Sequence, residues 1–130
     1  MAYVEDALNT FLLTQTAITA YVGTDIFHTE RPDELQSDFI TYQVVTTSND
    51  PLAFSVTDTA QPSIQIDVFS RNDANAIAIG NLLVTALNGL TSMTGLTLIQ
   101  SRAQGPEVSR DPDDEEWYHG IVIWDVEYVR

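Results

Sequence analysis

The stretch SIQIDVFSRNDANAIAIGNLLVTALNGL, residues 63–90, holds the two patterns that decide the fold. In its first part, 63–70, apolar residues alternate with Gln65 and Asp67, which predicts a strand with one buried face. In its second part, Asn72–Leu90, apolar residues follow the 3.6-residue period of a helix. This part begins with a good N-cap residue and ends in Asn-Gly, a common helix stop. The stretch therefore predicts a strand that leads directly into the main helix.

The same two periods identify the remaining elements on either side of this stretch. The first helix carries two acidic residues in its first turn, where the helix dipole favours them, and the other strands are rich in β-branched and aromatic residues. The predicted elements are helices at 3–14 and 17–22, strands at 39–47, 95–104 and 117–129, and a short strand at 25–30. We therefore expect one α+β domain, residues 1–130, with a mainly antiparallel four-stranded sheet packed by the N-terminal helix and one long central helix.

The composition excludes several classes of protein. A chain of 130 residues has the size of one domain. No run approaches the ~20 apolar residues of a membrane span, and Glu5 and Asp6 stand where a secretory signal carries positive charge. Because the chain has no cysteine, disulfides, thiolate metal sites and cysteine nucleophiles are excluded. We expect no membrane contact.

The charge balance is strongly acidic. The chain has 19 acidic residues and five basic ones, for a net charge of −14, and all five basic residues are arginine. Such a chain lacks the basic footprint of a protein that reads DNA grooves. Three interpretations of the charge stay open: solubility, adaptation to the high salt of a halophilic host, and a negative surface that DNA slides past or that mimics DNA.

Catalytic and metal-binding motifs do not emerge. The acidic segment 111–116 lacks the glycine that an EF-hand requires at its sixth position. His28 and His119 have no partner at metal-ligand spacing, and the chain contains no nucleophile elbow and no phosphate-binding loop. A carboxylate pair such as Asp67 and Asp125 could serve hydrolysis of a glycoside, but both lie on polar faces of strands. We expect no enzyme, no cofactor and no metal.

One face of the last predicted strand, 117–129, mixes polar and apolar residues. His119 marks this face as wet, yet Trp117, Ile121 and Ile123 share it. Three apolar side chains in register would form a patch, and such patches mark contact with a partner. Cover by a loop of the same chain is the alternative.

The order of these segments resembles a known family. The segments that carry the resemblance are "ITAYVGTDIFHTERPDEL" (18–35), "FITYQVV" (39–45), the strand 64–69 with its alanine-rich helix, and "YHGIVIWDVEY" (118–128). Their order is similar to that of the tail-completion, or tail-terminator, proteins of long-tailed, siphovirus-like phages and archaeal viruses. The chain departs from the family in having Asp38 before the second strand, where a proline is usual.

This resemblance implies a structural virion protein at the head-proximal end of the tail, assembled in the host cytoplasm. It implies a homo-oligomeric ring, commonly a hexamer, that caps the tail tube protein, meets the head-tail connector protein and lets DNA pass without specific binding. In such a ring the arginines would pair with carboxylates of a neighbouring subunit, with pairing inside the chain as the alternative. The candidate subunit interface is Trp117, Ile121, Ile123, Arg31, Arg71, Arg102 and Arg110.

The acidic segment that precedes the last strand is expected to be a solvated loop at the rim or lumen of the ring. Its carboxylates are Asp111, Asp113, Asp114, Glu115 and Glu116. A rival function is an acidic, DNA-mimicking regulator that binds a basic host protein, which would explain the charge but not the apolar surplus.

Overall fold

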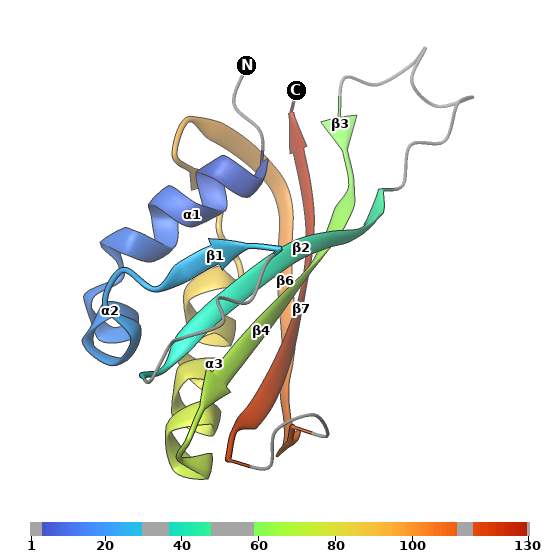
Figure 1. Ribbon diagram of the computed structural model, residues 1–130. Coiled ribbons are helices and arrows are strands. Elements are labelled where there is room, and N and C mark those ends of the chain that lie inside the picture. Colours follow the sequence, from blue (N-terminus) through green and yellow to red (C-terminus); the bar gives the residue numbers. More distant parts are fainter. Residues whose placement is uncertain (1–3, 30–36, 48–58, 112–115, 130) are drawn as a thin grey trace.

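The computed structural model describes residues 4–29, 37–47, 59–111 and 116–129 and has two layers, a helical layer and a curled sheet (Figure 1). The helices are α1 (Val4–Thr14), α2 (Thr16–Val22) and α3 (Asp73–Leu87). The strands are β1 (Ile26–His28), β2 (Phe39–Thr47), β3 (Thr59–Ala60), β4 (Pro62–Ser70), β5 (Ser92–Met93), β6 (Leu96–Arg110) and β7 (Tyr118–Val129). The sheet has seven strands in the order β1-β2-β4-β7-β6-β5, and β3 pairs with β7.

The predicted α+β class is confirmed, but the predicted sheet of four antiparallel strands is wrong. The sheet is larger and mixed, because β1 runs parallel to β2, with Ile26 opposite Ile40. The strands β3 and β5 have two residues each, too few to show a period of two. Strand β6 also continues beyond the predicted end through Gly105 and Pro106, where a register shift against β7 accommodates them.

The inner face of the sheet and the helices form the main core. The strands contribute every second residue to this core, as their two-residue period predicts. The helices contribute the apolar residues of one face. Trp124 of β7 is fully buried here, and its indole Nε1 donates to Ser101 Oγ at 2.9 Å. Other fully buried members of this core are Leu8, Leu12, Ile64, Ile66, Ile79, Leu83 and Val122.

Two local features fix the position of α3. The predicted N-cap is confirmed, since Asn72 Oδ1 accepts hydrogen bonds from the backbone N–H of Ala74 at 2.8 Å and of Asn75 at 3.3 Å. Further along, α3 lies so close to β6 that a Cβ at Gly80 would be 2.4 Å from Cβ of Pro106. Glycine is therefore required where the helix crosses this strand. None of the helices in the described ranges is long and apolar enough to cross a membrane.

Candidate interaction surface

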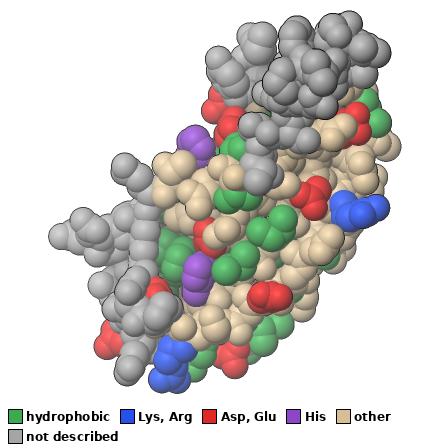
Figure 2. All heavy atoms as spheres, turned by 90° about the vertical axis from the view of Figure 1, so that its right-hand side faces the viewer, with side chains coloured by type: hydrophobic (Ala, Val, Ile, Leu, Met, Phe, Trp, Pro, Cys, Tyr) green, Lys and Arg blue, Asp and Glu red, His purple; other side chains and the backbone are tan. Residues whose placement is uncertain are grey.

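The sheet has an outer face, which is the face turned away from the three helices. Strand pairing brings polar and apolar side chains together in rows across this face: Thr41, Asp67, Ile121 and Glu107 form one row, and Ser63, Asp125 and Arg102 form another. Figure 2 shows hydrophobic, acidic and histidine side chains side by side over this surface. The outer face is thus the first candidate for contacts with other molecules.

One end of the outer face is closed by an aromatic cluster, which we define as Phe39, Phe69 and Trp117. The ring of Phe39 stacks on Phe69 at a centroid distance of 4.7 Å and meets the edge of Trp117 at 5.4 Å. Trp117 is only 3% exposed, so the chain itself covers this residue. The expectation that Trp117 forms part of an exposed patch is wrong, because β2 and β4 each supply a phenylalanine to this face.

Arg71 and Glu116 lie over this cluster. The guanidinium carbon of Arg71 is 4.9 Å from the centre of the Trp117 ring, and its Nη1 is 3.5 Å from Glu116 Oε2. The cation–π contact and the ion pair are therefore made within the chain itself, so Arg71 is already engaged by residues of its own subunit. Glu116 keeps 72% of its side chain exposed, as expected for the acidic segment.

A histidine–carboxylate pair follows the cluster along the outer face. His119 Nε2 is 2.7 Å from Asp67 Oδ1, which also accepts from Gln65 Nε2 at 2.9 Å, and the His119 ring stacks on Phe69 at 4.5 Å. These contacts fix the orientation of the imidazole. No third ligand joins the pair, since the described residues contain no group of three or more His, Cys, Asp or Glu suited to a metal ion.

The carboxylates Asp67 and Asp125 do not form a catalytic pair. Asp67 faces Ile121 across the strands, whereas Asp125 lies four positions further along β7. Four residues of strand separate two groups by about 13 Å, and glycoside hydrolysis needs carboxyl groups within about 10 Å of each other. Each carboxylate is also engaged locally, since the hydroxyl of Ser63 donates to Asp125.

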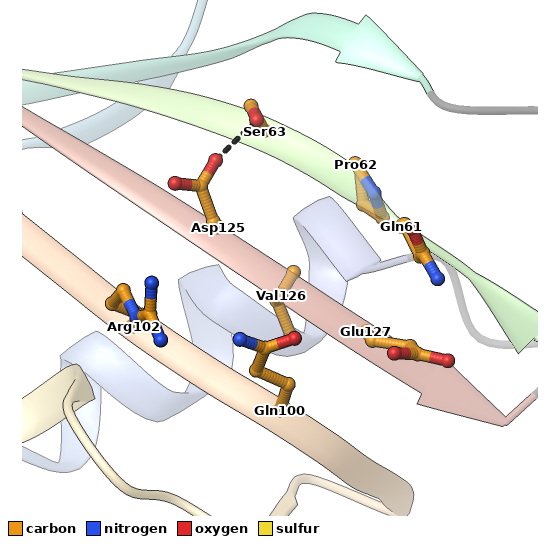
Figure 3. Close-up of a pocket in the computed structure, with 8 residues that line it drawn as sticks. All are labelled: Gln61, Pro62, Ser63, Gln100, Arg102, Asp125, Val126 and Glu127. Carbon is orange, nitrogen blue, oxygen red and sulfur yellow. Dashed lines mark hydrogen bonds between the residues drawn. The ribbon is translucent and has the colours of Figure 1, made fainter.

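A shallow pocket of about 360 Å³ lies at the other end of the outer face (Figure 3). Asp125, Glu127 and Arg102 supply its charges, and its other lining residues are Gln61, Pro62, Ser63, Gln100 and Val126. Within the described part of the chain, Arg102 forms no hydrogen bond or ion pair. The pocket therefore holds an arginine that is free to bind a group from another molecule.

Comparison with known protein families identifies the family of this chain. Residues 6–126 match the model of the family described as "Tail completion protein gp17". The chain belongs to this family. The predicted resemblance to tail-completion proteins is confirmed, and the match covers nearly all of the three helices and of the sheet.

A solved structure has the same fold. It is a chain from the "Virion of native gene transfer agent (GTA) particle", with a TM-score of 0.71, 16% identity and 100% of both chains covered. At this identity the likeness concerns the fold alone. No curated protein matches the chain.

The structure disperses the residues that the sequence predicted for an interface of this tail-completion protein. Arg110 donates from Nη2 to the hydroxyl of Tyr118 at 3.0 Å, so it contacts its own chain, as Arg71 does. Ile121 and Ile123 are half-buried on the outer face. Arg31 lies outside the described residues.

The acidic segment is likewise only partly as expected. Asp111 is 4% exposed and its backbone N–H donates to the carbonyl of Trp117 at 2.8 Å, so the expectation of a solvated side chain is wrong for this residue. Burial follows from its place at the end of β6, beside the aromatic cluster. Asp113, Asp114 and Glu115 lie outside the described residues.

The sequence pattern revealed neither the aromatic cluster nor the His119–Asp67 pair. The signal for the cluster was Phe69, an apolar residue on the polar side of the alternating run 63–70. The signal for the pair was weak, because the two residues are 52 positions apart in the chain. Both features depend on the strand register.

Proposed function

We propose that this chain is a structural subunit of a virus tail that assembles with other copies into a ring of six subunits, the number that the family resemblance implies. In this proposal the ring closes the head-proximal end of the tail tube, contacts the connector protein and leaves a channel for DNA. The match of residues 6–126 to the tail completion family carries the proposal.

A ring requires two different contact surfaces on each subunit, because neighbours meet head to tail. The two-layer fold supports this arrangement, since it presents the helical layer on one side and the outer sheet face on the other (Figures 1 and 2). On the outer face, Ile121 and Ile123 supply apolar area, and the guanidinium of Arg102 supplies hydrogen-bond donors for carbonyl and amide oxygens of a neighbour. We propose that these three residues contact the adjacent subunit.

The acidity of the chain supports passage of DNA without binding. A net charge of −14, with no lysine, repels phosphate, and the outer face carries Glu107, Asp125 and Glu127. A channel wall built from such subunits would let DNA pass without holding it.

The native mass of the purified protein tests the ring. Light scattering after size separation, at about 0.1 M and about 2 M salt, covers the range in which charge screening changes most. We expect a mass near six times the 14.4 kDa of one chain, or a shift toward it at high salt, which would also support a salt-adapted surface. A protein that stays monomeric at both salts, and that does not bind the ends of purified tail tubes in electron micrographs, would refute the ring.

The acidic outer face also supports a second candidate function. In this alternative the chain is an acidic regulator that mimics DNA and binds a basic host protein. The carboxylates of Glu107, Asp125 and Glu127 on β6 and β7 are the observation that favours it. Competition distinguishes the two functions, because duplex DNA would displace the partner of a DNA mimic and would leave a tail ring intact.

A further inference from the structure

The charged residues of this chain are unevenly distributed. They make up 18% of the chain, yet the segments 7–24 and 74–101 contain no Asp, Glu, Lys, Arg or His. These two segments include most of α1, all of α2, nearly all of α3, and β5. The charges that the structure describes lie instead on the strands, in the connecting segments and in the first turns of α1 and α3.

The helical parts of the two uncharged segments form a single layer in space. Helix α2 packs against α3, and α1 packs against β5. The hydroxyl of Thr94, next to β5, donates to the carbonyl of Ala7 at 3.2 Å and so joins the segments directly. We call the helical part of these segments, residues 7–24 and 74–91, the uncharged helical layer (left side of Figure 1).

The solvent side of this layer carries large apolar side chains. Leu13 on α1, Tyr21 on α2 and Ile77 on α3 are 41%, 39% and 42% exposed. The exposed positions that follow Ile77 on α3, Asn81 and Thr85, are uncharged as well. Single exposed apolar residues are ordinary, but depletion of charge around them is the compositional mark of the centre of a protein interface.

We propose that the uncharged helical layer is the surface by which one copy of this chain docks on a second copy. The inference rests on the proposed ring and names one of its two contact surfaces. Two chains of net charge −14 repel each other, and carboxylates opposed across a contact oppose association. Because the helical layer of one copy has no carboxylates, it can meet a surface of the second copy without placing carboxylates opposite each other.

The same property disfavours other occupants. A basic protein would be drawn to the acidic outer face rather than to an uncharged surface. A membrane-binding helical surface carries Lys or Arg at its polar border, and this layer has neither. A second copy is the partner that the charge distribution fits.

Charge insertion at one exposed amide tests the proposal. Asn81→Asp adds a single carboxylate to the helical layer with almost no change in shape. Asn72→Asp is the matched control, since it makes the same change at an exposed position outside the layer, the N-cap of α3, where Asp caps as well as Asn. We expect Asn81→Asp to raise the apparent Kd of self-association by about tenfold or more. We expect this effect at both about 0.1 M and about 2 M salt, because a charge buried in a contact is screened poorly.

Sedimentation of wild type and variants gives the readout, with circular dichroism to confirm folding and Thr85→Glu as a second variant in the same layer. If wild type forms the ring and Asn81→Asp and Thr85→Glu assemble as well as wild type, the helical layer is not the contact, although the ring stands. An equal loss for Asn72→Asp, seen only at low salt, would show a net-charge effect and overturn the inference. A wild type that is monomeric at both salts and on tail tubes overturns the ring and this contact together.

Discussion

Gly80→Ala tests how closely the helical layer is held against the sheet. In the structure, a Cβ at position 80 would lie 2.4 Å from Cβ and 2.5 Å from Cγ of Pro106. Non-bonded carbon atoms are comfortable at about 3.5 Å or more, so α3 and β6 would have to separate by about 1 Å. The proline ring is anchored to the backbone at both ends and cannot rotate away.

The magnitude follows from two opposing effects. Overpacking of a tight contact costs about 1–3 kcal/mol, whereas alanine is better than glycine in a helix by about 1 kcal/mol. Because two ring atoms clash and neither can move independently, we expect the upper part of the first range. The net loss in the free energy of unfolding of Gly80→Ala is therefore about 1–2 kcal/mol.

Urea denaturation followed by tryptophan fluorescence measures this loss, since Trp124 is buried in the core beneath α3. Thr85→Ala is the control, because this exposed position on the same helix gains helix propensity without a clash. We expect Thr85→Ala to be as stable as wild type or more stable by less than about 1 kcal/mol. A Gly80→Ala protein as stable as wild type would refute the rigid contact between α3 and β6.

Two further predictions concern stability. Burial raises the pKa of Tyr42, with the nearby charges of Asp6 and Glu5 adding to the effect and a hydrogen bond with Asn9 opposing it. The neutral Tyr42 side chain therefore stabilises the folded state fully below the ordinary tyrosine pKa of about 10. This stabilisation of the folded state is lost as the pH rises through the raised pKa. Urea denaturation between pH 8 and pH 11 should show this fall, and Tyr42→Phe should reduce it; an identical pH dependence in the variant would contradict the assignment. Asn72→Ala removes the acceptor of two N-cap hydrogen bonds and should cost about 1 kcal/mol, whereas Asn72→Ser should cost much less, and equal losses for both would argue against a capping role.

The sequence predicted well those features that depend on neighbouring residues. The alternation in 63–70 predicted β4, and the helical period after Asn72 predicted α3. The structure contains both elements, and Asn72 is the N-cap of α3 as expected. The order of elements likewise predicted the family, since order and spacing belong to the chain itself. The sequence contains the two charge-free segments 7–24 and 74–101, but only the fold brings their helices together into one layer.

Tertiary structure decided the features that depend on residues far apart in the chain. Strands of two residues, such as β3 and β5, exist only because a partner strand supplies their hydrogen bonds, and Pro106 continues β6 only because the register shifts there. Trp117 is covered by Phe39 and Phe69, which arrive from two other strands. The sequence by itself thus determined the local elements, the charge and the family, because these follow from periodicity and composition. The size of the sheet, the buried cluster and the separation of charged and uncharged faces required the fold, because each depends on which strands become neighbours.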